Sequence, residues 1–346
     1  MKRILFRADG SKEIGMGHLN RSSIIGKEFI LNGNDVNLLT KNNNSSFLFL
    51  KKKEIKIQTL PTFKSMGEEI EFLSKWIIIE KIDIFFLDVL NHVEYSELLE
   101  ICKENNVVSV LITDESEKMN DLNANIILNG NPNQLKYNYD DFSGKYLAGP
   151  RYFIMDQDYS LIENNQPNEE IRNILVTLGG SDHNNLLFQV LKALDNICEN
   201  VEISVITTNA SGYIDELRTL LDTMESSTNV YVDVDSLTKY WNKCNIAVTA
   251  GGNTLFERIS TRTPGATVCQ LERQMEISDY FMKLGVNYNV GLGKELSLND
   301  MENKLQLFLT DFDLQKEQYY NAKGVVSGDG LKLLMDELFK IPHLSN

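Results

Sequence analysis

Short apolar runs alternate with amphipathic segments along almost the whole chain, and this alternation constrains the fold more than any other feature. The run 82–88 (IDIFFLD) is the clearest strand candidate, because it is largely apolar and ends in the acid Asp88. Strands that are apolar on both faces are typical of parallel sheets covered by helices. Between such runs, Ser22, Ile25 and Phe29 fall on one face of a helix. The pattern therefore predicts an α/β fold with parallel sheets.

The alternation runs through the chain twice, with a polar interruption near the middle. Residues 156–170 are polar and contain Pro167, and strands and helices resume after them. A chain of 346 residues is long enough for two domains. We predict two doubly wound, Rossmann-like domains, residues 1–155 and 171–346, joined by the linker 156–170. Ligands of such sheets bind at the carboxyl ends of the strands, so we expect the domains to face each other across a cleft.

Charge and cysteine usage exclude several classes of protein. The chain carries 34 Lys and Arg against 49 Asp and Glu, a net charge of −15. Such an acidic surface repels nucleic acid and anionic lipid, so neither is an expected partner. No apolar run approaches the ~20 residues of a membrane span, and the start of the chain lacks the apolar stretch of a secretory signal. The four cysteines form no Cys-x-x-Cys pair, so we expect a cytoplasmic protein with no metal and no cofactor. The oligomeric state stays open.

The first strand-to-helix turn, residues 9–18 (DGSKEIGMGH), is the strongest candidate for chemistry. Gly15 and Gly17 let backbone N–H groups approach a ligand, and the following helix adds a partial positive charge. Asn20 replaces the third glycine of a dinucleotide fingerprint, and no phosphate-loop lysine follows. His18 falls in the first helical turn, where the dipole favours a neutral imidazole that can accept a proton. A capping or packing histidine is the alternative.

Two further glycine-rich turns lie in the second half. Residues 178–182 (LGGSD) open the restarted domain, where a diphosphate could meet a helix amino terminus, with Ser181 or Asp182 as the helix cap. Residues 250–254 (AGGNT) suit a second phosphate-binding helix start. Glu257, one turn further on, could bind the two hydroxyls of a ribose. Its alternative is an ordinary solvated glutamate.

Other patterns are weaker. Asp-x-Asp pairs at residues 156, 233 and 311 match a motif of some metal-dependent sugar transferases. In a chain with 49 acids they are expected by chance, and we interpret them as surface residues. His92, just after the strand that ends at Asp88, is expected to be a solvated loop residue.

The segment Arg7–Arg21 (RADGSKEIGMGHLNR) resembles the amino-terminal motif of the UDP-sugar hydrolases of pseudaminic acid biosynthesis and of related spore-coat polysaccharide proteins. Their pattern is Arg-[Ala/Ser]-Asp, a short loop, Ile-Gly-x-Gly-His and an Arg. The residues TLGGSD (177–182), the pair Asp114-Glu115 and the SGDG at 327–330 are also similar. The carboxyl half, with AGGNTLFERI and LERQMEISDYF, looks like the wider GT-B enzymes of sugar nucleotides. The resemblance implies a GT-B fold whose last helix can return to the amino-terminal domain.

In those hydrolases the histidine of the motif activates a water, without a metal. The water attacks the anomeric carbon of a UDP-linked diacetamido-trideoxy sugar, and UDP leaves with inversion. The resemblance therefore implies a UDP-sugar as partner and His18 as catalytic base, with Asp9 assisting. It implies that the substrate is bound by Arg7, Gly15, Gly17, Arg21, Asp88, Gly180, Ser181, Gly252, Asn253, Thr254, Glu257 and Gln274.

Two positions depart from the family pattern, and two other functions remain open. The run Val89-Leu90-Asn91 stands where family members carry an aromatic residue near the sugar, and Phe256 stands where an Asn can occur. One alternative is a GT-B glycosyltransferase, in which a sugar hydroxyl replaces the water. The other is a sugar-nucleotide-binding protein without catalysis. Transferases with membrane-bound acceptors usually carry a basic or apolar patch, and its absence from this acidic sequence favours hydrolysis.

Overall fold

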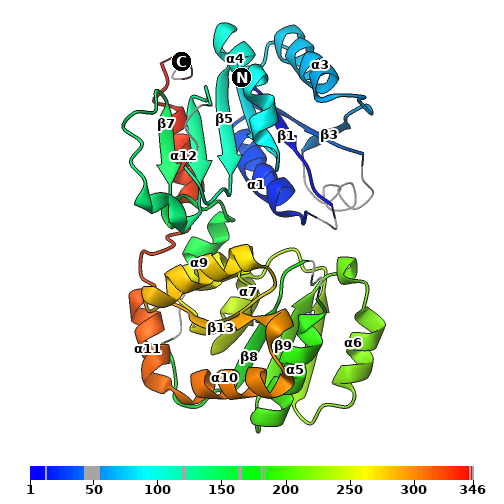
Figure 1. The fold of residues 1–346 in the computed structure, drawn as a ribbon, viewed down its shortest axis with the longest axis vertical. Helices are drawn as coiled ribbons and strands as arrows, with labels where there is room; N and C mark the ends of the chain where they lie inside the picture. The colour runs from blue at the N-terminus through cyan, green and yellow to red at the C-terminus, as the bar shows by residue number, and fades with distance from the viewer. Residues whose placement is uncertain are drawn as a thin grey trace. The chain divides into compact units, whose positions relative to one another are not determined.

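The chain divides into two compact units. The computed structural model describes residues 1–11, 14–42, 55–118, 122–162, 166–180, 182, 184–342 and 344. Unit 1 comprises Met1–Asp156 and Asp329–Asn346, and unit 2 comprises Gln157–Gly328 (Figure 1). Each unit is built on one parallel sheet with helices packed on both faces. The predicted α/β fold with two doubly wound, Rossmann-like sheets is confirmed.

The described part of unit 1 forms a seven-stranded parallel sheet in the order β3-β2-β1-β4-β5-β6-β7. Its strands are β1 (Arg3–Ala8), β2 (Asp35–Thr40), β3 (Lys56–Thr59), β4 (Ile84–Asp88), β5 (Val108–Thr113), β6 (Ile126–Asn129) and β7 (Lys145–Ala148). Its helices are α1 (Gly17–Leu31), α3 (Met66–Ile79), α4 (Ser96–Glu104) and α12 (Gly330–Leu338).

Successive side chains of a strand point to opposite faces, so the apolar strands of this sheet feed two separate cores. Phe6 and Phe86 stack on each other in the core beneath α1 and α12. Leu5 and Phe85 belong to the core beneath α3 and α4. The helix α12 comes from the far end of the sequence, yet its residues Leu331, Leu334, Met335 and Leu338 are buried in the first of these cores.

The described part of unit 2 forms a six-stranded parallel sheet in the order β10-β9-β8-β11-β12-β13. Its strands are β8 (Asn173–Thr177), β9 (Glu202–Thr207), β10 (Ser227–Val232), β11 (Ile246–Thr249), β12 (Gly265–Cys269) and β13 (Tyr288–Leu292). Its helices are α5 (Leu186–Ile197), α6 (Ile214–Leu221), α7 (Thr238–Trp241), α8 (Asn253–Ser260), α9 (Glu272–Lys283), α10 (Leu298–Thr310) and α11 (Phe312–Asn321). One apolar core joins α5 and α10 to the sheet, while α8 and α9 contact β11 to β13.

The strand order reverses once in each sheet, and these reversal points position the candidate sites. In unit 1 the reversal lies between β1 and β4, and in unit 2 between β8 and β11. Ala8 pairs with Asp88 across the first, and Thr177 with Thr249 across the second. Connections leave the two strands of a reversal point toward opposite sides, so side chains of the two turns can meet at the carboxyl edge.

Several elements differ from the sequence-based expectation. The edge strands β3, β7 and β13 were not expected, because they are short or contain polar residues, as in KIQT at β3. The strand β12 begins at Gly265 and ends at Cys269. A side chain at Gly265 would collide with the neighbouring strand and with Arg258, so this small residue belongs inside the sheet.

Candidate active site and nucleotide site

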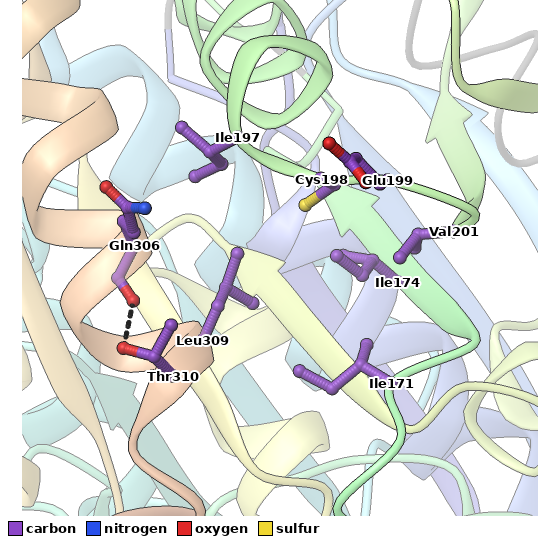
Figure 2. Close-up of a pocket in the computed structure, with 9 residues that line it drawn as sticks. All are labelled: Ile171, Ile174, Ile197, Cys198, Glu199, Val201, Gln306, Leu309 and Thr310. Atoms are coloured by element: carbon purple, nitrogen blue, oxygen red, sulfur yellow. Dashed lines mark hydrogen bonds between the residues drawn. The ribbon is translucent and has the colours of Figure 1, made fainter.

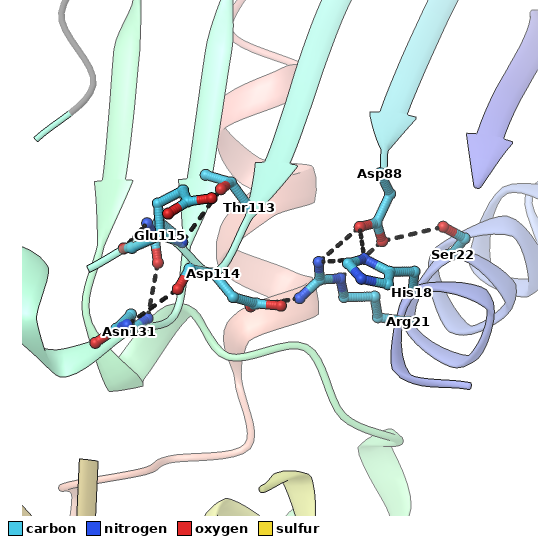
Figure 3. A network of polar contacts seen from close by, with 9 residues as sticks. His18, Arg21, Ser22, Asp88, Thr113, Asp114, Glu115 and Asn131 are labelled. Atoms are coloured by element: carbon cyan, nitrogen blue, oxygen red, sulfur yellow. Dashed lines mark hydrogen bonds and ion pairs between the residues drawn. The ribbon is translucent and has the colours of Figure 1, made fainter. Parts of the chain in front are cut away.

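His18 and Asp88 meet at the carboxyl edge of the unit 1 sheet (sheet 1), where the strand order reverses between β1 and β4. His18 is the second residue of α1, and Asp88 is the last residue of β4. Because β1 and β4 are neighbours, the turn that leaves β1 brings the start of α1 beside the end of β4. The Nδ1 atom of His18 lies 2.6 Å from Oδ1 of Asp88 (Figure 3). Asp88 is fully buried, whereas His18 retains 9% of its surface, so only the imidazole can face a ligand.

Asp88 is kept ionised by its neighbours. Burial raises the pKa of Asp88, but Arg21 and His18 lower it by more, so the pKa stays below its ordinary value. Arg21 donates from Nε to Oδ2 at 2.7 Å and from Nη2 to Oδ1 at 2.6 Å. The Ser22 hydroxyl lies 3.3 Å from Oδ2. At neutral pH this side chain is therefore a carboxylate, which only accepts hydrogen bonds.

A carboxylate partner fixes the tautomer of His18. Since Asp88 has no proton to give, the 2.6 Å contact requires that Nδ1 of His18 carries one. The lone pair is then on Nε2. An imidazole in this form accepts a proton from water or from a hydroxyl. The carboxylate behind it stabilises the imidazolium that results.

Arg21 extends the pair toward the next two strands. Its Nη1 donates to Oδ1 of Asp114 at 2.6 Å, and its Nη2 lies 3.0 Å from Nδ1 of His18. Asp114 follows β5, and its carbonyl accepts from Nδ2 of Asn131, which follows β6 (Figure 3). Burial lowers the pKa of Arg21, but Asp114 and Asp88 raise it by more. Arg21 thus holds two carboxylates in place and orients the histidine through Asp88.

Arg7 and Asp9 form a second, separate cluster. Arg7 is fully buried and donates to both oxygens of Asp9, at 2.6 and 2.8 Å, and to Oε1 of Glu69 at 2.8 Å. Tyr95 also donates to Glu69. Burial raises the pKa of Asp9, but Arg7 and Lys41 lower it by more. In this structure Arg7 cannot touch a ligand, and Asp9 is occupied by its partner, so this cluster anchors the turn.

The two glycines of the first turn have different roles. Gly15 adopts φ +81°, a backbone conformation that disfavours other residues, and its N–H donates to the Ser11 carbonyl at 2.9 Å. Gly17 begins α1, and Met16 before it provides no side-chain cap. Gly15 therefore closes the turn, whereas the first amides of α1 have no side-chain acceptor from that cap.

His92 lies differently from the expectation. We expected a solvated residue, but His92 has only 2% of its surface exposed. Its Nε2 has no hydrogen-bond partner within the described ranges. Burial lowers the pKa of His92, which keeps the ring neutral. The single-turn helix His92–Tyr95 directly after β4 folds this ring inward.

In unit 2 the turn after β8 is not itself a helix start. Gly179 has φ +84°, and Gly180 is exposed, its carbonyl accepting from Oγ1 of Thr208 at 2.7 Å. Ser181 lies outside the described residues. The helix α5 begins only at Leu186, and the Asp182 carboxylate accepts from the N–H groups of residues 186 and 187 at 3.0 and 2.8 Å. An internal acid therefore occupies the amino terminus of α5.

The turn after β11 leads directly into a helix that has no such acid. Gly252 is the residue before α8 and Asn253 its first residue, with no side-chain cap and no acid in the first turn. Asn253 is exposed. Oγ1 of Thr254 is buried and has no hydrogen-bond partner among the described residues. Glu257 lies half-buried one turn further along the same helix. The structure thus brings these four predicted residues together on one helix start.

Gln274 supports that helix start from α9. Its Oε1 accepts from the Gln270 backbone N–H at 2.8 Å, and the Gln270 side chain donates to the Leu178 carbonyl at 2.6 Å. A side chain at Gly251 would lie 2.8 Å from Cβ of Gln274. This glycine is required because α9 passes so close. Gln274 therefore links both glycine turns of unit 2.

Two residues of these networks were missed as site residues by the sequence analysis, and so was the buried Arg258 of α8. Asp114 was noted only as part of a resembling pair, and Asn131 and Arg258 were not proposed. The run Asn129-Gly130-Asn131 after a strand was the available signal for Asn131, since such side chains commonly bond to neighbouring turns. No local signal marked the buried Arg258.

A cavity of roughly 190 Å³ lies elsewhere in unit 2 (Figure 2). Ile171, Ile174 and Val201 line it at the starts of β8 and β9, and Ile197 and Cys198 at the end of α5. Burial raises the pKa of Cys198 to about 11, so the thiol is unreactive at neutral pH. The two glycine turns follow the opposite, carboxyl ends of β8 and of its neighbour β11. This cavity therefore takes no part in the site.

Metal-binding clusters and membrane-spanning helices are both absent from the described residues. No three His, Cys, Asp or Glu side chains in these ranges lie close enough together to hold a metal ion. Within the same ranges, no helix combines the length and the apolar character that crossing a bilayer requires.

Solved structures with the GT-B fold match the architecture of this chain. A MurG crystal structure from Acinetobacter baumannii matches with a TM-score of 0.69 at 14% identity, covering 99% of this chain and 100% of that one. The spinosyn rhamnosyltransferase SpnG complexed with thymidine diphosphate matches with a TM-score of 0.66 at 12% identity, covering 97% and 99%. The predicted GT-B fold is confirmed.

Homologous sequences carry the resemblance further, although no family model matches the chain. An uncharacterized protein of Methanocaldococcus jannaschii is 26% identical over 97% of this chain and 70% of its own length. The spore coat polysaccharide biosynthesis protein SpsG of Bacillus subtilis is 22% identical over 94% of both chains. The UDP-2,4-diacetamido-2,4,6-trideoxy-beta-L-altropyranose hydrolase of Campylobacter jejuni is 21% identical over 82% of this chain and 97% of its own. The predicted resemblance to these hydrolases and spore-coat proteins is confirmed.

Proposed function

We propose that the protein hydrolyses a UDP-linked amino sugar of surface-glycan biosynthesis, by inversion and without a metal. The observation that carries this proposal is the hydrogen-bonded pair of His18 and Asp88 at the carboxyl edge of sheet 1. The name of the Campylobacter relative supports the substrate class, and the names of the GT-B neighbours support a nucleoside diphosphate.

In the proposed reaction Nε2 of His18 takes a proton from a water molecule. The water oxygen forms a bond to the anomeric carbon while the bond from that carbon to the diphosphate oxygen breaks. The electron pair of the broken bond goes to the diphosphate, which leaves as UDP. Asp88 stabilises the imidazolium, and Arg21 keeps Asp88 ionised and in place.

We propose that the diphosphate is held at the start of α8. Four amides at a helix start have no partner within the helix and attract anions. Gly252, Asn253 and Thr254 present such amides without a competing carboxylate, whereas Asp182 fills the corresponding place on α5. Glu257 accepts the ribose hydroxyls in this proposal, and Gln274 fixes the turn.

The same dyad would serve a transferase, in which a sugar hydroxyl takes the place of the water. The GT-B neighbours named as transferases favour that second candidate. A binding protein without catalysis is the third. The test is incubation of the protein with UDP-linked mono- and diacetamido sugars, without acceptor and with EDTA, followed by NMR. We expect release of UDP and an inverted free sugar. Turnover only with an added acceptor would support the transferase, binding without turnover the third reading, and turnover only with Mg²⁺ or Mn²⁺ would contradict the metal-free step.

A further inference from the structure

The helix α8 carries a buried cation, Arg258, that forms no ion pair with an acid among the described residues. Arg258, in the last turn of α8, has no exposed surface. Its Nη1 donates to the Thr263 carbonyl at 3.0 Å, and its Nη2 donates to Oδ1 of Asn287 at 2.6 Å. Both acceptors are neutral. Its Nε has no hydrogen-bond partner in the described part of the chain.

The sheet is shaped to receive this side chain. A Cβ at Gly265 would lie 2.7 Å from Cδ of Arg258, so the first residue of β12 has to lack a side chain. Asn287 is itself held by Oγ1 of Thr267 at 2.7 Å and donates to Oγ of Ser278 at 2.8 Å. The guanidinium is therefore bonded by Thr263 and Asn287, which precede β12 and β13, and α9 holds Asn287 in place through Ser278.

Folding alone does not account for a charge at this place. Burial lowers the pKa of Arg258 to about 9. Arg7, equally buried in unit 1, pairs with Asp9 and Glu69, and these partners raise its pKa above the ordinary value. A buried charge without a partner is costly, and an apolar side chain of similar size often serves stability as well or better. A functional reason for the charge is therefore worth seeking.

We infer that Arg258 is a positioning residue whose buried charge strengthens the binding of an anion at the start of α8. This inference rests on the proposed diphosphate site. Arg258 lies five residues, ~7.5 Å, along the helix axis from Asn253, and its guanidinium bonds Thr263 and Asn287 beyond the end of α8, so the cation and a bound phosphate would be on the order of 12 Å apart. At an effective dielectric constant of ~20 this separation corresponds to at most about a tenfold gain in affinity per ligand charge. The charge of Arg258 would not change the affinity for uridine, would raise the affinity for UMP and would raise the affinity for UDP most.

The test measures the affinity of wild-type protein and variants for uridine, UMP and UDP by calorimetry at one ionic strength, together with thermal unfolding without ligand. Arg258→Met removes the charge and keeps an unbranched apolar side chain that replaces the stem of the arginine. Arg258→Gln keeps a polar group and covers the case in which the methionine variant does not fold. Arg262→Met is the matched control, because Arg262 follows the same helix but lies half-buried on the ring of Tyr319.

We expect both Arg258 variants to weaken UDP binding ~3–10-fold more than uridine binding, with an unfolding temperature near that of the wild type. Arg262→Met should leave the ratio of the two affinities unchanged. Equal weakening of all three ligands, or an unchanged UDP to uridine ratio in folded variants, would overturn the inference while leaving the proposed function intact. A wild-type protein that binds no UDP would overturn both.

Discussion

The carboxyl edges of the two sheets differ in the chemical groups that they present. The edge of sheet 1 is a network of charged side chains that satisfy one another: His18, Asp88, Arg21 and Asp114. The edge of sheet 2 presents glycines and helix amides, and its α8 start carries no acid. Proton transfer requires side chains of fixed protonation and orientation, while anion binding requires donors with no competing acceptor. In our proposal, unit 1 therefore carries the chemistry and unit 2 the affinity for the ligand.

Replacing His18 tests the chemical half of this comparison and should have the largest effect. General-base catalysis typically contributes ~10²–10⁴-fold. We expect His18→Asn to lower kcat by about that factor and to remove the acidic limb of the pH–rate profile. UDP affinity measured by calorimetry should stay within about twofold.

The matched control is His92→Gln, because this ring is buried near the same strand end and belongs to neither proposed role. Its kcat should remain close to that of the wild type. If His18→Asn instead keeps its turnover, His18 is a packing residue and the hydrolase proposal loses its main support.

Replacing Asp88 tests whether the contribution of the unit 1 network to the free energy of unfolding depends on pH. Removing one partner of a buried ion pair costs about 3–5 kcal/mol, so Asp88→Asn should be strongly destabilised at neutral pH. The pKa of Asp88 is lowered in the folded protein, so its stabilising contribution is complete above the unfolded pKa of ~3.9. That contribution is lost as the pH falls through the lower, folded value.

Urea unfolding of wild type and Asp88→Asn at several pH values measures this directly. The difference in the free energy of unfolding should be constant above about pH 5 and narrow below ~4. A control with Asp114→Asn should lose less, since this carboxylate is 60% exposed. A difference that does not depend on pH would mean that Asp88 is not ionised in the folded state.

Replacing Glu257 tests the affinity half of the comparison. Loss of hydrogen bonds to a charged group costs ~1–3 kcal/mol, so Glu257→Ala should weaken UDP binding by that amount. Glu276→Ala, on the exposed face of α9, should leave it unchanged. An unaltered calorimetric affinity for Glu257→Ala would remove this residue from the site.

Sequence reasoning proposed His18 and Asp88 as residues of the candidate site but did not predict that they pair. The acid at the end of an apolar strand and the histidine after Gly-x-Gly are local patterns, so Asp88 and His18 could be proposed separately. Their contact depends on strand order, because β1 lies next to β4 although two strands intervene in the sequence. No single segment of the sequence determines the order of strands in a sheet. The contacts of Arg258 likewise depend on residues from distant segments.

The turn at residues 178–182 shows a second limit. Two glycines before an acid predicted a phosphate-binding helix start, but the chain makes one more turn through Asn185, which adopts φ +52°, before α5 begins. Asp182 then folds back onto the amides of that helix. The spacing of glycines indicates where a backbone can approach a ligand. Whether the helix amides are available to that ligand depends on whether a side chain of the protein, here Asp182, already binds them.

The two helix starts of unit 2 give the smallest and most discriminating test. Asp182→Asn weakens the cap of α5, and losing such a cap typically costs ~1 kcal/mol. We expect a slightly lower unfolding temperature for Asp182→Asn, with its UDP affinity unchanged.

The reciprocal variant, Asn253→Asp, places a carboxylate at the open start of α8, where it stabilises the helix by ~0.3–1 kcal/mol but repels a phosphate. This variant should unfold at an equal or higher temperature and bind UDP several-fold more weakly. The opposite pattern, with affinity lost in Asp182→Asn and kept in Asn253→Asp, would move the anion site from α8 to α5. The comparison would then have to be redrawn, because an internal acid would be competing with the ligand for the same amides.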